Sequence, residues 1–215
     1  MLAHLRREYT LNGLRRSDLV PDPIAQFKNW FDQATATTPN AEAVEINAMT
    51  LATADKDGNP SARIVLLKGV DQRGFIFFTN YESRKGRELA ENPKAALVFY
   101  WPELERQVCI AGVVSKVSAA ESEQYFQLRP RGSRIAAWAS KQSDVLADRA
   151  ALEQTWKQLE ARYPGQEIPM PPFWGGFVLS PSRVEFWQGR PNRLHDRFRY
   201  SKQANSSWRI ERLAP

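Results

Sequence analysis

The chain has 215 residues, 42% of them hydrophobic, so it can bury the core of one domain or at most two. Its net charge of +6 favours an acidic partner, which could be nucleic acid, a membrane surface or a phosphorylated small molecule. No apolar run reaches membrane-spanning length and the first residues lack the apolar core of a secretory signal, so we expect a cytoplasmic protein that does not enter membranes.

Residues 1–20 are basic and polar, which predicts a mobile N-terminal arm, and residues 21–215 are expected to form a single domain. Apolar side chains at helical spacing predict a helix from Ile24 to Ala34 that ends before Pro39. From Ala48 the apolar period changes to two, which is typical of strands. Strands are expected at residues 48–55, 61–70, 75–80, 94–101 and 106–118, and again at 175–181, 182–189, 195–201 and 207–213.

The first three strands are joined by short turns and predict a β-meander. Ser83 and Pro93 mark the ends of a short helix that follows them. Residues 119–163 are helical in pattern, and the Pro-rich residues 167–176 are not expected to pair as a strand. An apolar stripe in the last helical part is expected to join the core, at Val145, Leu152, Trp156 and Leu159. Together these elements predict a mainly β fold with flanking helices, in which the antiparallel strands close into a barrel.

Polar and cationic residues gather where the third strand gives way to a helix, at Thr79, Ser83, Arg84 and Lys85. A helix N-terminus offers free N–H groups and partial positive charge, so this segment predicts a phosphate site. Arg63, on an expected barrel strand, adds a cation that is costly to bury without an anion. Helix capping beside a solvated charge pair would explain the same residues.

A second group, Tyr125, Arg129 and Ser133, recurs at a spacing of four, the distance of helical neighbours if a helix continues across Pro130. A guanidinium, a phenol and a hydroxyl could together bind a second phosphate. An exposed helix face that ends at the proline is the alternative.

The remaining polar candidates do not favour a metal or a nucleophile. Cys109 is the only cysteine and lies in an apolar segment, and the two histidines have no suitably spaced carboxylates, so we expect no metal site. The neutral side chains of Gln107, Gln142 and Ser143 would suit the edge of a heterocycle, or would lie on the surface.

Residues 183–197 are densely charged, with Arg183, Arg190, Arg193 and Arg197 beside Trp187 and His195. If the segment after Pro191 is extended, Arg193, His195 and Arg197 point to one face. Three positive groups on one face repel one another unless an anion lies among them. A solvated basic strand is the alternative interpretation.

Blocks of sequence that follow one another along nearly the whole chain resemble the pyridoxine/pyridoxamine 5′-phosphate oxidase family. They are RIVLLK (63–68), FTNYESRKGREL (78–89), ERQVCIAG (105–112), YFQLRPRGSRIAAWASKQS (125–143), PPFWGGF (171–177), EFWQGRPNRLHDRF (185–198) and IERLAP (210–215). The resemblance implies an antiparallel, Greek-key-like split β-barrel that forms a homodimer with FMN at the interface. The implied reaction oxidises pyridoxine or pyridoxamine 5′-phosphate to pyridoxal 5′-phosphate, passing electrons to FMN and then to O2 to give H2O2.

The resemblance also implies which residues touch each ligand. FMN contacts fall on Arg63, Ile64, Val65, Leu66, Leu67, Lys68, Phe78, Thr79, Arg84, Lys85, Gln107, Gln142, Ser143, Trp187 and Arg197. Substrate contacts fall on Arg6, Tyr9, Lys68, Tyr125, Arg129, Ser133, Arg193 and His195, with Arg6 and Tyr9 in a flap over the substrate. Arg193 and His195 are the implied catalytic pair, in which His195 could accept a proton. Phe78 stands where the family has a tyrosine, so only a backbone role is inherited there.

Two other functions are compatible with the residues alone. Another FMN-binding split-barrel oxidoreductase, such as a flavin reductase, would share the cofactor and not the substrate. A basic nucleic-acid-binding barrel would stack bases on tryptophans, for which Trp101, Trp138, Trp174 and Trp187 are candidates. The resemblance favours the oxidase, for which no nucleic acid partner is expected.

Overall fold

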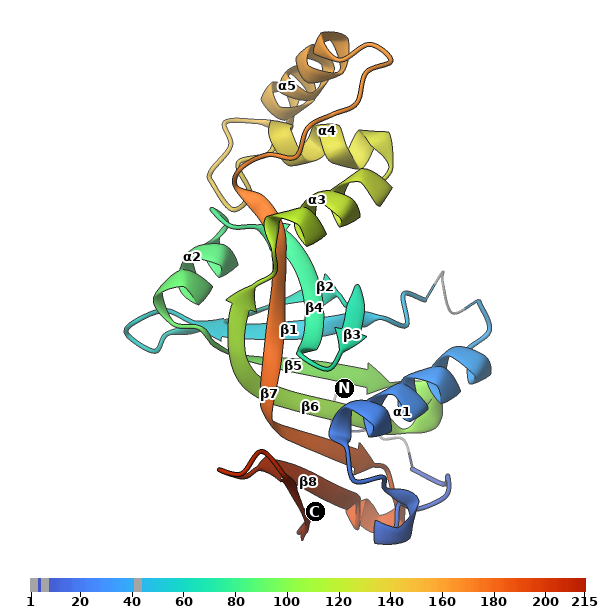
Figure 1. Ribbon diagram of the computed structural model, residues 1–215. Helices are drawn as coiled ribbons and strands as arrows, with labels where there is room; N and C mark the ends of the chain where they lie inside the picture. Colours follow the sequence, from blue (N-terminus) through green and yellow to red (C-terminus); the bar gives the residue numbers. More distant parts are fainter. Residues whose placement is uncertain (1–3, 5–7, 41–43) are drawn as a thin grey trace.

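The computed structural model describes residues 4, 8–40 and 44–215, and its strands form one curled antiparallel sheet with helices around it (Figure 1). The strands are β1 (Ala48–Ala54), β2 (Pro60–Leu66), β3 (Gly69–Asp71), β4 (Gly74–Asn80), β5 (Lys94–Trp101), β6 (Arg106–Lys116), β7 (Trp174–Gln188), β8 (Asp196–Lys202) and β9 (Trp208–Leu213). The helices are α1 (Pro23–Thr37), α2 (Arg84–Glu91), α3 (Ala119–Leu128), α4 (Arg131–Ala139) and α5 (Arg149–Arg162). Short 3-10 turns lie at η2 (Arg16–Asp18), η3 (Pro102–Leu104) and η4 (Pro191–Arg193). Arg6 of the expected flap lies outside the described residues.

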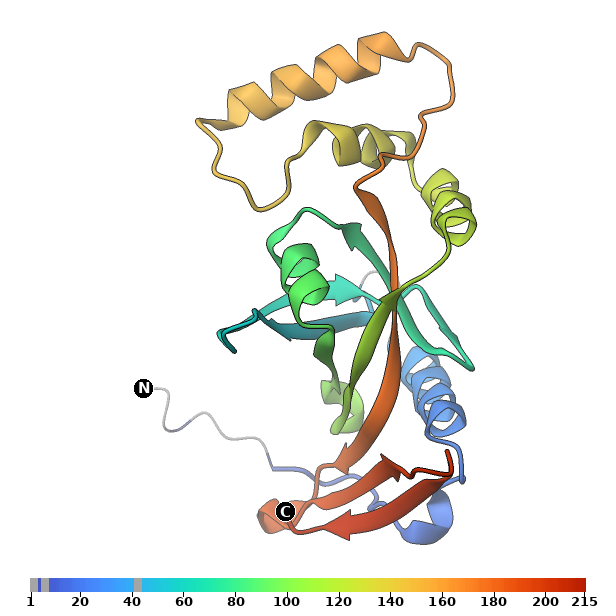
Figure 2. The ribbon, with the colours of Figure 1, turned by 60° about the vertical axis from the view of Figure 1, so that its left-hand side comes forward.

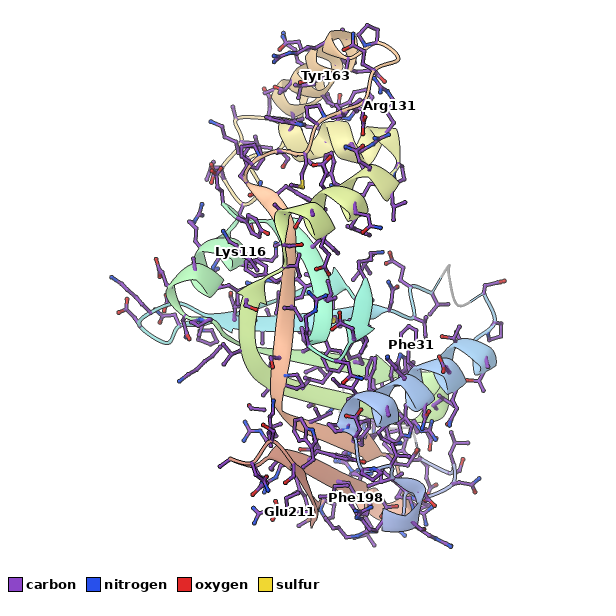
Figure 3. All side chains as sticks on the ribbon, viewed as in Figure 1. Phe31, Lys116, Arg131, Tyr163, Phe198 and Glu211 are labelled. Atoms are coloured by element: carbon purple, nitrogen blue, oxygen red, sulfur yellow. The ribbon has the colours of Figure 1, made fainter. Side chains whose placement is uncertain are left out.

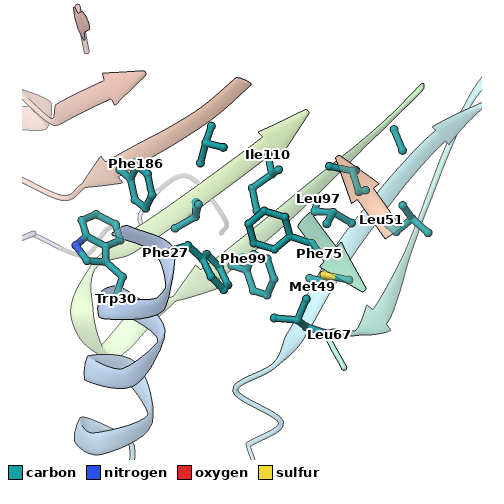
Figure 4. Packing of buried hydrophobic residues seen from close by; sticks show 14 of the residues in the cluster. Phe27, Trp30, Met49, Leu51, Leu67, Phe75, Leu97, Phe99, Ile110 and Phe186 are labelled. Atoms are coloured by element: carbon teal, nitrogen blue, oxygen red, sulfur yellow. The ribbon is translucent and has the colours of Figure 1, made fainter. Parts of the chain in front are cut away.

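Helix α1 begins where the sequence predicts and packs against the concave face of the sheet. The Asp22 carboxylate caps it by accepting hydrogen bonds from the N–H groups of Ile24 and Ala25. Phe27 and Trp30 are buried and meet the inner residues of the strands, as Figure 4 shows. The Phe27 ring lies 4.9 Å from the ring of Phe75 and 4.9 Å from that of Phe99. This aromatic contact fixes the helix to the core.

The strand order is β2-β1-β5-β6-β7-β4-β3. Both predicted hairpins form, as β1–β2 and β3–β4, but no ladder joins β2 to β4, so the three expected strands do not make a continuous meander. The expected strand at residues 61–70 is divided, because β2 pairs with β1 only to Leu66 and Lys68 then donates its N–H to Ile76 of β4. β4 pairs with β7, which is almost 100 residues later in the chain. The two local hairpins are therefore joined by long-range pairing and not by the β2–β4 pairing that a meander requires. The sheet curls like a barrel, but no ladder joins β2 to β4, so the predicted closure is not complete in the part of the chain described.

Strand β7 is the axis of the molecule. The two strands expected at residues 175–181 and 182–189 form this single strand, which pairs with β6 along its length, with β4 in its first half and with β8 in its second. Its first residues come from the Pro-rich segment that we did not expect to pair. A register shift at Gly112 bends the pair β6–β7, and a Cβ there would lie 2.1 Å from the Ser180 carbonyl oxygen, so only glycine fits. The bend gives the sheet its curl.

The two ends of β7 carry different substructures (Figure 2). Helices α3, α4 and α5 lie at one end around a small core of Phe126, Ile135 and Trp174, whereas β8 and β9 form a hairpin at the other. Figure 3 labels Arg131 and Tyr163 at the helical end, and Phe198 and Glu211 at the hairpin end. The expected apolar stripe is only partly right: Trp156 and Leu159 pack on the small core while half-buried, but Val145 lies before α5 and is fully exposed.

Candidate functional site

A cavity of about 780 Å³ lies between β2, β4, α3 and α4. Nine of the residues expected to contact FMN line it, namely Arg63, Ile64, Val65, Leu66, Lys68, Phe78, Thr79, Lys85 and Gln142. Three further residues expected to contact the substrate line it too, namely Tyr125, Arg129 and Ser133. The structure thus brings the two predicted phosphate sites into one cavity. Because β2 is the last strand on its side of the sheet, its free edge offers backbone polar groups to a ligand.

Lys85 is the central cation at one side of this cavity. Its Nζ donates to Gln142 Oε1 at 2.9 Å, to Thr79 Oγ1 at 3.2 Å and to Ser83 Oγ at 3.4 Å, all of them neutral groups. Ser83 also caps α2, as the sequence predicts, by accepting a hydrogen bond from the Gly86 N–H. Burial, followed by the charge of Arg63, lowers the pKa of Lys85 to about 8. A cation that is desolvated and surrounded by neutral donors and acceptors is suited to an anionic ligand.

Arg129 is the corresponding cation across the cavity. Its Nη1 atom is buried and has no hydrogen-bond partner among the described residues, and its guanidinium lies 4.8 Å from the Trp174 ring. Burial lowers the pKa of this guanidinium. The near-parallel rings of Phe78, Tyr125 and Trp174 contact one another, with Phe78 4.0 Å from Tyr125 and 5.6 Å from Trp174, and Tyr125 6.1 Å from Trp174. A buried donor without a partner indicates a ligand with acceptor oxygens.

The geometry of this second group differs from the expected helix. α3 ends at Leu128, and α4 begins at Arg131, so no helix continues across Pro130. Proline lacks the N–H that a continuing helix needs, and it forces the preceding residue, Arg129, into an extended conformation. Arg129 and Ser133 face the same cavity because the chain turns between the two helices.

Three residues of the predicted FMN set lie beside this cavity and do not line it. Leu67 is buried with 7% of its surface exposed, facing the core under α1. The Arg84 Nε atom donates to Glu88 at 2.8 Å, and Ser143 is exposed with a left-handed φ of 78°.

The remaining predicted residues gather at the far end of β7, and we call Tyr9, Trp187, Arg193, His195 and Arg197 the hairpin-end cluster. The Trp187 ring lies 4.6 Å from that of His195, and the Tyr9 ring lies 5.5 Å from Trp187 and 5.6 Å from His195. Arg197 donates from Nε to Glu185 Oε1 at 2.7 Å and is opposite Trp187 in the β7–β8 ladder. Gln107 faces Trp187 across the β6–β7 ladder and donates to Cys109 Sγ at 3.1 Å.

The segment after Pro191 is not extended as predicted. It forms the short turn η4, and both Asn192 and Arg193 have left-handed φ values, 57° and 60°. Such values are strained for residues other than glycine and occur most often at functional sites. The strand begins only at Asp196, yet Arg193, His195 and Arg197 remain close enough for the two arginines to influence His195 electrostatically.

His195 is held as a neutral imidazole with a defined tautomer. Burial, and then the charges of Arg193 and Arg197, lower its pKa. The Arg190 N–H donates to His195 Nδ1 at 3.2 Å, so the ring proton resides on Nε2. In this tautomer Nε2 is a hydrogen-bond donor, and the role of His195 as a proton acceptor stays a prediction.

Glu105 connects the N-terminal residues to the hairpin-end cluster. Its carboxylate, 1% exposed, accepts hydrogen bonds from the N–H groups of Leu11 at 3.1 Å and Thr10 at 3.3 Å. A Cβ on Gly189 would lie 2.7 Å from the Tyr9 ring and 3.0 Å from Glu105, so the glycine lets both approach. Glu105 thereby holds Tyr9 against His195.

Replacing Glu105 with alanine is expected to release this segment, because two charge-assisted hydrogen bonds, each worth about 1.5–3 kcal/mol, are lost. Trypsin is then expected to cut after Arg15 or Arg16 at least about tenfold faster, as measured by mass spectrometry during limited digestion. Glu103→Ala, an exposed change in the same turn, is the control and is expected to leave the rate unchanged. Equal cleavage of both variants would contradict the role given to Glu105.

Sequence reasoning missed four residues of this architecture, namely Trp174, Glu88, Glu105 and Arg190. Trp174 lines the cavity, and the other three hold predicted site residues in place. Glu105 binds residues 94 and 95 positions earlier, so no local spacing marks it. Glu88 lies four residues after Arg84 and Arg190 lies in a charged segment, and these were the available signals.

Two family models together match most of the chain. The model described as pyridoxamine 5′-phosphate oxidase matches residues 37–163, and the pyridoxine 5′-phosphate oxidase C-terminal dimerisation region matches residues 174–215. Proteins named pyridoxine/pyridoxamine 5′-phosphate oxidase from Paraburkholderia phymatum and Nostoc punctiforme are 58% and 56% identical over 214 residues, covering 100% of this chain and 99% and 98% of those proteins.

The chain is also similar to a solved structure that contains a phenazine-type ligand. That structure is PhzG from Burkholderia lata 383 in complex with tetrahydrophenazine-1-carboxylic acid, with a TM-score of 0.86 and 33% identity, covering 97% of this chain and 100% of that one. A pyridoxamine 5′-phosphate oxidase-related FMN-binding protein from Nostoc punctiforme, 20% identical with a TM-score of 0.71 over 92% of this chain and 99% of its own, shares the fold.

The split-barrel sheet, the cavity lined by cations and the full-length relatives agree with one another. None of the described helices is both long and apolar enough to cross a membrane. The chain therefore belongs to the pyridoxamine 5′-phosphate oxidase family, and it is an FMN-dependent oxidoreductase.

Proposed function

We propose that this protein oxidises pyridoxamine 5′-phosphate and pyridoxine 5′-phosphate to pyridoxal 5′-phosphate. O2 is the final electron acceptor, H2O2 is released, and the amine substrate also takes up water and yields ammonia. The observation that carries the proposal is the buried Nη1 of Arg129, which has no partner in the described part of the chain and lies in the same cavity as Lys85. Two phosphates need two cationic sites, and the cavity offers both.

The Lys85 side of the cavity fits the FMN phosphate. Lys85, Thr79 and Gln142 supply donors there, and Arg63 and Arg84 add charge from β2 and α2. The free edge of β2, residues 63–66, would lie against the flavin ring. When bound, FMN supplies the acceptor for the hydride that leaves the substrate.

The Arg129 side fits the substrate phosphate. Tyr125 and Ser133 add hydroxyl donors to the guanidinium, and Lys68 lies exposed at the cavity wall as a further cation. A guanidinium can donate two parallel hydrogen bonds to a phosphate, which gives orientation as well as affinity.

The hairpin-end cluster completes the site only if it comes from a second copy of the chain. Trp174, at the cavity, and Trp187, in the cluster, are near opposite ends of β7. A strand rises about 3.3 Å per residue, which puts them on the order of 40 Å apart along the strand. A single FMN cannot bridge that distance within one chain. We infer a homodimer with FMN at its interface, in agreement with the match of residues 174–215 to a dimerisation region.

In that dimer each residue of the cluster has a distinct task. Trp187 and Gln107 would contact the flavin, and Arg197, fixed by Glu185, is a permanent cation for the negative charge that develops on hydride transfer. The Nε2–H of His195 would donate to a substrate oxygen, and Arg193 would orient the carbon that is oxidised. Tyr9 would cover the bound substrate and exclude water.

The proposal is tested by incubating the protein with FMN and pyridoxamine 5′-phosphate in air. We expect pyridoxal 5′-phosphate and H2O2 in equal amounts, measured by absorbance and a peroxidase-coupled assay. A yellow protein that forms no aldehyde would favour another flavin enzyme, and a colourless protein with salt-sensitive oligonucleotide affinity would favour the nucleic-acid-binding alternative.

The similarity to PhzG supports a second candidate, the oxidation of a reduced phenazine carboxylic acid. Such a substrate has no phosphate, so it leaves the donors of Arg129, Tyr125 and Ser133 without their expected partner. Turnover of tetrahydrophenazine-1-carboxylic acid in the same assay, at a higher kcat/KM than pyridoxamine 5′-phosphate, would favour this candidate.

A further inference from the structure

One carboxylate lies behind the cations of the Lys85 side. The Glu88 side chain, on α2, is 7% exposed, and its two oxygens receive hydrogen bonds from four side chains. Oε2 accepts from Thr53 Oγ1 at 2.5 Å, from Ser61 Oγ at 2.6 Å and from Arg63 Nη2 at 3.2 Å. Oε1 accepts from Arg84 Nε at 2.8 Å. A buried carboxylate is stable only when it is hydrogen-bonded this completely.

Glu88 binds two arginines, Arg63 and Arg84, at the same time. Arg63 comes from the edge strand β2 and Arg84 from the first residue of α2, so the carboxylate joins the strand to the helix. The Arg63 guanidinium also donates to Leu51 O and Thr53 Oγ1, which leaves it a single orientation. Arg84 is 61% exposed and has its Nη atoms free for another acceptor within the described structure, because Nε alone is bound to Glu88.

The net charge of the residues on the Lys85 side of the cavity matches that of a phosphate. Arg63, Arg84 and Lys85 contribute three positive charges, and Glu88 removes one. The net charge of about +2 on these four side chains balances a phosphate monoester, which carries about −1.5 to −2 at neutral pH. Without Glu88, three cations would repel one another whenever the phosphate is absent.

We propose that Glu88 is a positioning residue for the FMN phosphate: it holds Arg63 and Arg84 in place and balances their charge beside Lys85. The inference rests on the proposed FMN site, and it adds a residue that does not touch the cofactor. Glu88 acts on binding through the two arginines and through the charge state of Lys85.

The protonation of Lys85 makes FMN affinity depend on pH, and this dependence reports on Glu88. The charged groups around it are Arg63 from β2 and Glu88 from α2, whereas β4 and the loop after α4 contribute neutral Thr79 and Gln142. Burial and Arg63 lower the pKa of Lys85 to about 8, and Glu88 opposes them. A bound phosphate favours the ammonium form, so FMN affinity is full below pH 8 and falls as the pH rises above it, by up to about tenfold per pH unit. Removing the Glu88 charge moves the start of this fall to lower pH.

The test compares Glu88→Gln with Glu91→Gln, a change of equal charge at an exposed position of the same helix. Apoprotein is titrated with FMN, and with riboflavin as a ligand without phosphate, by quenching of flavin fluorescence between pH 6 and pH 10. For Glu88→Gln we expect the FMN Kd at pH 9 to rise about tenfold or more, with the midpoint of the pH profile shifted down by about one unit. Riboflavin affinity, and both properties of Glu91→Gln, are expected to match the wild type.

The outcomes separate the two proposals. If wild-type protein binds FMN no better than riboflavin at every pH, the proposed phosphate site fails. If it prefers FMN but Glu88→Gln keeps the wild-type midpoint, the role of Glu88 is overturned. Should Glu88→Gln not fold, Glu88→Asp, which keeps the charge but withdraws the carboxylate from Arg63 and Arg84, replaces it. An FMN Kd of Glu88→Asp equal to that of the wild type overturns the positioning role, and a rise of about tenfold with unchanged riboflavin affinity supports it.

Discussion

Arg129→Ala is expected to raise the KM for pyridoxamine 5′-phosphate by about 10- to 100-fold, because a bidentate charge-assisted contact to phosphate is worth about 1.5–3 kcal/mol. The buried Nη1 atom has no partner among the described residues, so the variant removes a donor that serves only the ligand. FMN affinity is expected to stay near the wild-type value, since the cofactor phosphate is assigned to the Lys85 side. Steady-state kinetics of pyridoxal 5′-phosphate formation and a flavin titration measure the two effects.

Two controls accompany this variant. Arg149→Ala removes an arginine with an 88% exposed side chain at the start of α5 and is expected to leave the KM unchanged. Pyridoxamine without its phosphate is expected to be an equally poor substrate for wild type and variant. An unchanged KM in Arg129→Ala would assign the substrate phosphate to another part of the cavity.

Mixing two impaired variants is expected to restore activity, at a substrate concentration well below the KM of Arg129→Ala, if the site is shared between chains. Arg129→Ala damages the cavity, and Arg193→Ala damages the hairpin-end cluster, where we expect turnover to fall by about a hundredfold with flavin retained. In a heterodimer of the two, both defects fall in one site and the other site is intact. Random mixing makes about half of the dimers mixed, so about a quarter of all sites regain full activity. Co-refolding of the two variants, followed by the oxidase assay, measures the recovery.

The matched control pairs Arg129→Ala with Ser133→Ala, which lie on the same side of the site. Every site of that heterodimer carries one defect, so no recovery is expected. Absence of recovery in the first mixture, with heterodimers present by mass spectrometry, would mean that one chain builds the whole site.

Local elements followed from the sequence because their causes are local. The helix of Phe27 and Trp30, the Ser83 cap and the strand at residues 94–101 depend on spacing and neighbouring residues, and the structure contains all three. The pairing between hairpins did not follow from the sequence, because it depends on distant segments. The short turns do form the hairpins β1–β2 and β3–β4, but no ladder joins β2 to β4, and the two hairpins are instead connected through β5, β6 and β7.

The candidate site divides in the same way. Sequence motifs identified the cations, and even the groups to which they belong, because arginine, lysine and hydroxyl side chains are recognisable in short segments. Two predictions from spacing were wrong: a helix across Pro130 and an extended segment after Pro191. In each case the proline ends the regular conformation on which the spacing argument depended.

The amino-acid sequence by itself determined the family, the cofactor class and the residue types that can bind two phosphates. Only the tertiary structure decided that Lys85 and Arg129 share one cavity, and that the hairpin-end cluster lies at the other end of β7. It also decided that Glu88, Glu105 and Arg190 hold the others in place. The physical reason is that hydrogen bonds and ion pairs act between neighbours in space, and folding brings together residues that can lie more than 100 positions apart, such as Arg190 and Leu11, 179 positions apart.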